Sequence, residues 1–402
     1  MGRMATQNGH SGGVGRLTAR QRGRQLTETA ARRFHRYGFH GVALIDVARD
    51  VGITAPALYR HFRNKNALLA ATVHSGLDLV DAAFTTGGES WVELLSEFAG
   101  VALVRRDLWA LLQREVRHLG EPERHAVEAR FDDFVARLSM RLRAVRPDAD
   151  SEQRQLLLVA VLGTLASPAV SGLRIGRERY QRVLTAAAIA ASKVSLPAVA
   201  AAPRVAMSRQ RSAVPQTRGE QLLETAVSLF HERGYTAVTL DDIGAAVGLA
   251  GPSIYHHFAT KSDLLVTAFS KAARRLALSR ASGVDEAVLD NLVRGYIELG
   301  VQQRQLFGVY VTEAVNLPPE AGRRIRRELA ANVAEWRYAL QRSRPELGEA
   351  TSSVLVHAAR GIVNDVVRVG GLHARPGIVA ELTALVRGVL NTAVPKERGV
   401  SG

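Results

Sequence analysis

One stretch of 21 residues occurs twice in this chain, and its pattern restricts the fold more than any other feature. The copies span residues 42–62 and 238–258, so they lie 196 positions apart. In the first copy, Leu44, Val47 and Ala48 put apolar side chains on one face of a short helix. We expect that helix to end at Gly52, because glycine takes a positive φ without strain and lets the chain turn sharply. Two short helices joined by such a turn form a helix-turn-helix.

The two copies differ in their helix caps. In the first copy Thr54 is placed to cap the second helix, with Pro56 in its first turn, where a missing N–H costs nothing. In the second copy Thr239 is placed to cap the first helix. Alanine, which cannot cap, stands at the corresponding positions Ala43 and Ala250. Since a cap contributes about 1 kcal/mol, the copies should not be equally stable.

The composition favours two domains and an anionic partner. A chain of 402 residues suits two domains of about 200 residues each, as the repeat also indicates. The absence of cysteine excludes disulfides, thiolate metal sites and cysteine nucleophiles, and it is typical of a reducing compartment. The net charge of +15 and the pI of about 10.8 make nucleic acid the leading partner and a membrane surface the second.

No segment predicts export or a membrane span. The residues before Gly15 are polar and rich in glycine, without the apolar core of a signal peptide. The longest apolar run, 156–170, is too short to cross a bilayer and contains Pro168, which favours a buried helix. We therefore expect a cytoplasmic protein, associated with the nucleoid if its partner is DNA.

The apolar periodicity predicts an all-α protein whose second half repeats the first. Helices are expected in the first half at 18–37, in the helix-turn-helix, from Lys65, and near 89–105, 107–119, 122–145, 151–171 and 177–194. The later helices of the second half are expected near 285–303, 305–316, 319–343, 349–370 and 376–391. The predicted divisions are a flexible arm (1–17), a helix-turn-helix domain (18–64), a helical regulatory domain (65–194), a linker (195–215), a second helix-turn-helix domain (216–260) and a second regulatory domain (261–394). The arm is either a plain tail or a segment that touches DNA.

Several residues in both copies resemble the DNA-binding domain of the TetR family of transcriptional regulators. They are Gly38, Phe39, Tyr59, His61, Phe62, Lys65 and Leu68, and then Gly234, Tyr235, Tyr255, His257, Phe258, Lys261 and Leu264. Two such units in one chain resemble the double-TetR regulators of actinobacteria, which include a repressor of a mammalian-cell-entry lipid-transport operon. The resemblance implies that each recognition helix reads a major groove of double-stranded DNA. The residues that it places at DNA are Thr54, Ala55, Pro56, Ala57, Tyr59, Arg60, His61 and Lys65, and Thr239, Gly251, Pro252, Ser253, Tyr255, His256, His257 and Lys261.

The residue types suit these positions. Tyr59 and Tyr255 can donate an O–H to a phosphate, and a lysine at a helix N-terminus attracts one, which fixes position and not sequence. Arg60 can form a bidentate pair with guanine, whereas His256 cannot, so the two half-sites should differ. The pair of adjacent histidines has no third ligand at metal spacing, and no metal or other cofactor is expected. Each tyrosine could also belong to the core, and the basic first helix could be a plain solvated face.

The resemblance also implies a ligand pocket and a four-helix dimer interface in the regulatory domains. Because this chain holds two such domains, we expect an intramolecular pseudo-dimer, with higher oligomers possible on DNA. Candidate pocket residues are Trp109, Phe131 and Phe134 in the first half, and Tyr296, Phe307, Tyr310 and Trp336 in the second, although aromatic residues at helical spacing also form plain core. Glu115 and Glu313 are candidate polar anchors, with a salt bridge as the alternative. The scarcity of buried charge favours an apolar ligand of acyl or sterol type.

The expected function is that of a DNA-binding regulator, a repressor of lipid-transport or lipid-metabolism genes that an apolar ligand releases from an asymmetric operator. The alternative is a ligand-binding or sequestering protein whose helix-turn-helix units have degenerated. An enzyme is poorly supported, because the chain has no nucleophile elbow, glycine-rich phosphate loop, HExxH motif or cysteine, and no catalytic residue is proposed.

Overall fold

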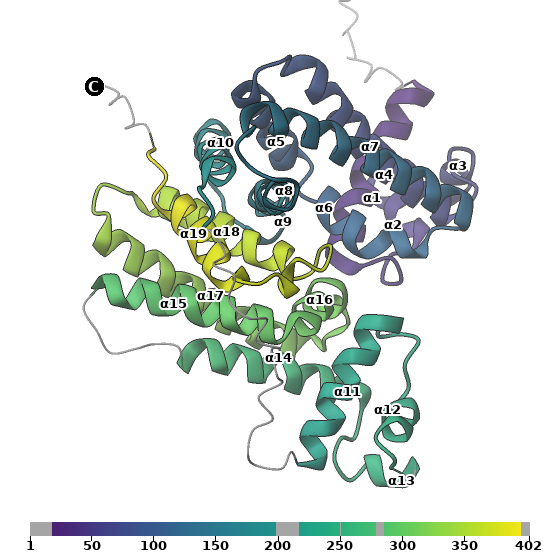
Figure 1. The fold of residues 1–402 in the computed structure, drawn as a ribbon. Coiled ribbons are helices and arrows are strands. Elements are labelled where there is room, and N and C mark those ends of the chain that lie inside the picture. Colours follow the sequence, from purple (N-terminus) through teal and green to yellow (C-terminus); the bar gives the residue numbers. More distant parts are fainter. Residues whose placement is uncertain (1–17, 198–216, 250, 279–284, 395–402) are drawn as a thin grey trace, which may run out of the picture.

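The computed structural model describes residues 18–197, 217–249, 251–278 and 285–394, and all regular secondary structure within them is helical. This confirms the predicted all-α class. Figure 1 shows two halves with the same element order, whose helix-turn-helix domains lie on one side of the molecule and whose late helices pack together on the other. The predicted arm and most of the predicted linker lie outside the described residues.

The first helix-turn-helix domain contains α1 (Ala19–Tyr37), α2 (Leu44–Asp50) and α3 (Ala55–Tyr59), and packs on the long helix α4 (Lys65–Thr86). Its core includes Leu26, Phe34 and Leu58, each fully buried. Gly52 has φ +73°, as the turn requires. The side chain of Asn64 accepts a hydrogen bond from the N–H of Ala67 at 2.8 Å and so caps α4.

The second domain repeats this plan with α11 (Arg218–Arg233), α12 (Leu240–Ala246), α13 (Gly251–Ile254) and α14 (Lys261–Leu278). Gly248 has φ +72°, close to the value at the matching turn of the first domain. Thr260 and Asp263 form a capping box, with bonds of 2.8 and 3.2 Å. The turn chemistry seen in the sequence therefore holds in both copies.

The regulatory helices also correspond, with an offset of 198. The first half contains α5 (Trp91–Val104), α6 (Leu108–Ala110), η1 (Leu111–Glu115), η2 (Val116–His118), α7 (Glu121–Val145), α8 (Ser151–Ala166), α9 (Pro168–Ser171) and α10 (Arg177–Lys193). The second half contains α15 (Asp285–Gln302), α16 (Arg304–Glu313), η3 (Ala314–Asn316), α17 (Pro319–Ser343), α18 (Glu349–Val366), η4 (Leu372–Ala374) and α19 (Ile378–Leu390). Because α7 and α17 begin and end at matching positions, residues can be compared across the halves by this offset.

One hydrophobic core joins the late helices of both halves. α8 and α10 pack against α18 and α19, and their buried side chains belong to a single cluster. Gly163 and Gly361 occupy matching positions and face each other, and a Cβ added at Gly163 would lie only 2.6 Å from the carbonyl oxygen of Gly361. When a residue contacts its own counterpart, the two surfaces are related by an approximate two-fold axis, as in a symmetric dimer.

The structure differs from the sequence prediction at three helices. The segment expected at 107–119 is divided into α6, the π-helix η1 and the 3₁₀-helix η2. The segment expected at 151–171 breaks at Ser167, before Pro168, because proline cannot continue a helix's hydrogen bonds. The helix α3 ends at Tyr59, three residues earlier than expected, although the N–H of Phe62 still bonds to the carbonyl of Leu58 at 3.0 Å.

Two helical segments have the length and hydropathy of a membrane span, namely α4 and residues 151–171. The second was expected to be too short, but the helical segment extends beyond the apolar run on which that expectation was based. More than half of each apolar window is buried within the protein. Packing in the core therefore accounts for their apolar composition.

Candidate nucleic-acid interface and ligand cavity

The recognition helix α3 presents its predicted DNA-facing residues to solvent. Thr54, Pro56, Tyr59, Arg60 and His61 are exposed, and Ala55 and Ala57 are half-buried. Tyr59 is 53% exposed while its neighbour Leu58 is fully buried, so the helix has an inner apolar face and an outer polar one. Thr54 stands at the N-cap position, but its side chain forms no cap hydrogen bond, which corrects the predicted cap and leaves its hydroxyl free to meet a phosphate.

The second recognition helix has the same exposure pattern. Tyr255 is 53% exposed, and His256 and His257 are exposed beside the fully buried Ile254. Ser253 is half-buried, while the side chains of Gly251 and Pro252 lie outside the described residues. The two domains therefore present a tyrosine in the same way, as matching DNA readers would.

Thr239 and the two candidate lysines are engaged within the protein. The hydroxyl of Thr239 donates to Asp242 Oδ2 at 2.6 Å and accepts from the Asp242 N–H at 3.1 Å, so Thr239 is the predicted cap of α12. The ammonium of Lys261 lies 4.3 Å from the centre of the Tyr235 ring and donates to the carbonyls of Tyr235 and Val238 at 2.6 and 2.7 Å. Lys65 lies 4.5 Å from the centre of the Phe39 ring. Burial lowers the pKa of both lysines, so each ties helix to turn, and any contact with DNA stays a prediction.

The two domains differ sharply in charge, a signal that the sequence contained and that our sequence interpretation missed. Residues 18–64 carry nine arginines against three carboxylates, a net charge of +6. Residues 216–260 carry two arginines against five carboxylates, a net charge of −3. Exposed Arg24 and Arg36 on α1 correspond to exposed Glu220 and Glu232 on α11. Since Lys and Arg supply most of the attraction of a protein to DNA, the charge of the first domain would attract DNA more strongly than that of the second.

An apolar cavity of about 80 Å³ lies in the first half, between α4, α5, α7 and α8. The predicted residues Trp109, Phe131 and Phe134 line it, together with Leu162 and other apolar side chains. Among the predicted residues of the second half, Tyr296 packs edge-on against Phe307 and Trp336, and Tyr310 against Phe269. The first half therefore holds an apolar space beside Trp109, Phe131 and Phe134, although these rings also contact one another as the second-half rings do.

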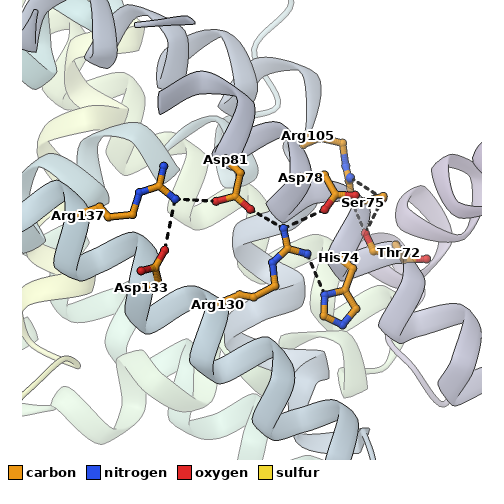
Figure 2. Close-up of polar contacts among 9 residues, drawn as sticks. All are labelled: Thr72, His74, Ser75, Asp78, Asp81, Arg105, Arg130, Asp133 and Arg137. Atoms are coloured by element: carbon orange, nitrogen blue, oxygen red, sulfur yellow. Dashed lines mark hydrogen bonds and ion pairs between the residues drawn. The ribbon is translucent and has the colours of Figure 1, made fainter. Parts of the chain in front are cut away.

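Two arginines lie at one end of this cavity. Arg105 is neutralised by Asp107 at 2.8 Å and donates to Ser75 Oγ at 3.0 Å and to the Thr72 carbonyl at 3.1 Å, both on α4 (Figure 2). Arg106 donates to the Leu173 carbonyl at 3.1 Å, and within the described ranges it has no carboxylate partner. The cavity thus offers an apolar interior with one arginine at its edge that packs on the Tyr180 ring and has no carboxylate partner within the described residues.

A second ionic network holds α7 against α4 beside the cavity. Arg130 bridges Asp78 and Asp81 at 2.9 and 2.6 Å, and Arg137 bridges Asp81 and Asp133 (Figure 2). α4 also packs on α1 of the helix-turn-helix domain. A shift of α7 would therefore displace α4, and α4 packs on the helix-turn-helix domain.

Comparison with known proteins identifies the repeated module. The model of the bacterial regulatory proteins of the tetR family matches residues 26–72 and again residues 222–268. Both modules resemble that family over less than half of the chain, and we call them the TetR domains. The matches lie on the helix-turn-helix units, and the regulatory helices fall outside them.

Curated relatives match this TetR module alone. The HTH-type transcriptional repressor KstR2 of Mycobacterium tuberculosis is 44% identical over 59 residues, which are 15% of this chain and 29% of that protein. The negative transcriptional regulator of the biofilm operon icaADBC, IcaR of Staphylococcus aureus, is 38% identical over 45 residues, which are 11% of this chain and 24% of IcaR. The chain therefore spans less than a third of the length of these relatives.

Solved structures of TetR regulators are also similar to the chain. PfmR of Thermus thermophilus is 22% identical, with a TM-score of 0.39, and covers 45% of this chain and 98% of its own. The ketosteroid regulator KstR2 of Mycobacterium tuberculosis is 24% identical, with a TM-score of 0.34, and covers 44% and 95%.

The predicted anchors Glu115 and Glu313 are not among the residues that line the cavity, and both are held by ion pairs. Glu115 accepts from the Phe39 N–H at 2.9 Å and pairs with Arg114, which donates to the Phe34 carbonyl at 2.7 Å. Glu313 pairs at 2.7 Å with Arg117, which belongs to the other half. Both glutamates are almost fully buried, and the ion-pair alternative describes each of them.

The π-helix η1 is a point where these contacts meet. Leu112 lines the cavity, Arg114 bonds to the end of α1, and Gln113 donates to Asp365 of α18 at 3.4 Å. Burial raises the pKa of Asp365, which also pairs with Arg368. The segment η1 therefore touches the cavity, the first TetR domain and α18 of the second half.

Proposed function

We propose that the chain is a sequence-specific transcriptional regulator that binds double-stranded DNA through both TetR domains as an intramolecular pseudo-dimer. The observation that carries the proposal is the presence of two matching recognition helices, each with an exposed tyrosine, in two halves whose late helices share one core. In a homodimer of such units the second domain would come from another subunit, and here the same chain supplies it. Higher oligomers on longer DNA remain compatible with this arrangement.

The proposed operator is asymmetric. Arg60 on α3 corresponds to His256 on α13, and only the arginine can form a bidentate pair with guanine. The difference in domain charge, +6 against −3, supports a tight half-site for the first domain and a weaker one for the second. One chain would then bind in a single orientation.

The proposed effector is a small apolar molecule that enters the first-half cavity and releases the DNA. The cavity, about 80 Å³, is smaller than the engineered cavity of about 150 Å³ that binds benzene. A sterol skeleton would need a much larger opening of the helices than one acyl chain, and Arg106 could pair with the carboxylate of such a chain. An apolar ligand is consistent with a repressor of lipid-transport or lipid-metabolism genes that acts at the nucleoid in the cytoplasm. The matched relatives are named as a repressor and a negative regulator of transcription.

A ligand-sequestering protein with degenerate DNA-binding units is the second candidate. The acidic second domain favours it, because that domain has two arginines where the first has nine. The matching exposure of Tyr59 and Tyr255 argues against it, since a degenerate surface has no reason to keep both tyrosines outward. Only the regulator predicts that DNA affinity depends on both tyrosines.

Footprinting on the DNA upstream of the protein's own gene, across a salt series, tests the proposal. We expect one chain to protect two unlike half-sites, with an affinity that falls steeply as salt rises. Tyr59→Ala and Tyr255→Ala should each weaken binding about tenfold through a lost phosphate contact. Tyr338→Ala, on α17 and 63% exposed, is the matched control. Affinity that is insensitive to salt and to both tyrosines would favour the sequestering protein.

A further inference from the structure

The apolar cavity of the first half has a counterpart position in the second half, but different residues occupy it. By the offset of 198, Leu162 corresponds to Arg360, and Phe134 to Asn332. By this offset α7 and α17 match at both ends and α8 and α18 begin at matching positions, and the contact of Gly163 with Gly361 supports the same alignment. The comparison is therefore between equivalent points of two similar folds.

Arg360 fills this point in the second half. Its side chain reaches inward from α18 and is 8% exposed. Its Nη1 donates to Asn332 Oδ1 at 2.6 Å, and its guanidinium lies 4.0 Å from the centre of the Tyr296 ring and 5.7 Å from that of Trp336. Tyr296 is fixed in turn by a bond of 2.6 Å from its hydroxyl to Asn364 Oδ1.

These contacts are those of a packed structural group. A buried guanidinium is costly unless hydrogen bonds and aromatic faces compensate it, and here an amide oxygen and two rings do so. The residues that contact Arg360 differ from their first-half equivalents: Asn332 corresponds to Phe134, and Tyr296 corresponds to Phe98. Neither phenylalanine could form the hydrogen bond that its counterpart forms. The changes fit one another, as expected of a set that closes a space together.

We infer that the chain binds one apolar effector, in the first half, and that Arg360 with its partners closes the equivalent site of the second half. This deepens the proposed function, on which its regulatory meaning rests. The effector site then lies in the same half as the basic DNA-binding domain. Because η1 packs on α1 and on α16, and α16 packs on α11, one bound molecule would have a packed route to both helix-turn-helix domains.

Xenon-pressurised crystals of the full chain test this inference, because xenon occupies small apolar cavities regardless of the natural ligand. We expect xenon next to Phe131 and Leu162 and none between Tyr296 and Trp336. Leu162→Arg, which transplants the second-half residue, should abolish the xenon site. If that variant does not fold, Ala102→Phe fills the same cavity from α5.

Xenon in both halves, in the second half alone, or in neither would overturn the inference. Xenon that persists in the first half of both variants would do the same. DNA binding by the unmodified protein is measured separately. A protein that binds no DNA but takes up xenon in the first half alone would refute the proposed regulator and leave the single-cavity inference standing.

Discussion

The ion pair between Arg117 and Glu313 predicts that the two halves are energetically coupled near the DNA-binding domains. Arg117 lies on η2 of the first half, and Glu313 ends α16 of the second half. Their atoms Nη1 and Oε1 are 2.7 Å apart, and the side chain of Glu313 is 1% exposed. A Cβ added at Gly234, in the turn after α11, would lie 3.8 Å from the same carboxylate. The pair therefore supports the second TetR domain from the first half.

Arg117→Met keeps the length of the side chain and removes its charge. Glu313 would retain the bond of 2.8 Å from Asn316 but lose its cation. A hydrogen bond to a charged group contributes about 1.5–3 kcal/mol, and because Arg117 is 40% exposed, water replaces part of it. We expect a net loss of about 1–2 kcal/mol, which corresponds to local opening that is roughly 5–30 times more frequent.

Amide hydrogen exchange of Gly234, whose N–H bonds to the Phe230 carbonyl at 3.0 Å, reports this opening. The exchange rate should rise although the substitution lies in the other half of the chain. Arg182→Met removes an exposed ion pair with Glu178 and should leave that rate unchanged. If Arg117→Met accelerates exchange around its own helix alone, the halves are not coupled through this contact.

Three further predictions concern the interface, the pH response and the caps. Gly163→Ala should destabilise the protein by about 1–3 kcal/mol in denaturant titrations, because its Cβ would lie 2.6 Å from a backbone carbonyl oxygen. Gly23→Ala is the control: open space surrounds Gly23, so this substitution should stabilise α1 by about 0.5–1 kcal/mol. Burial and nearby cations lower the pKa of His118 to about 4, so its stabilising contribution is present above pH 6.5 and is lost as the pH falls from 6.5 toward 4, at up to about 1.4 kcal/mol per pH unit; a His118→Phe variant whose stability falls as steeply would contradict this. Thr239→Ala should cost about 1 kcal/mol and Thr54→Ala almost nothing, because only the first of these side chains forms a cap bond.

Local chemistry was predictable from the sequence because it depends on neighbours in the chain. Gly52 and Gly248 take a positive φ, Asn64 caps α4, and Thr260 begins a capping box, all as the residue types indicate. The failure at Thr54 is of the same kind, since a threonine at an N-cap position is free to turn its hydroxyl outward. Helix positions followed from the same local signals.

The roles of the buried charges were not predictable, because their partners are distant in the chain. Glu115 bonds to a backbone N–H 76 residues away, and Glu313 to a guanidinium 196 residues away. Periodicity shows that such residues lie on inner faces but does not show what they meet there. The cavity is similar, since Trp109, Phe131 and Phe134 line it while Trp336 is packed, and the difference depends on Arg360 from another helix.

Fusion of the two halves in one chain explains why such differences can accumulate. In a homodimer each substitution appears in both subunits, so an arginine that closes the cavity would close both copies, and a glutamate on the first helix would weaken both DNA contacts. Here Leu162 and Arg360, or Arg24 and Glu220, vary independently although the folds around them match. The shared core keeps the two recognition helices paired, while each half is free to change its charge and its interior. On the proposed function, that freedom is what allows a single effector and an asymmetric operator to be served by one molecule.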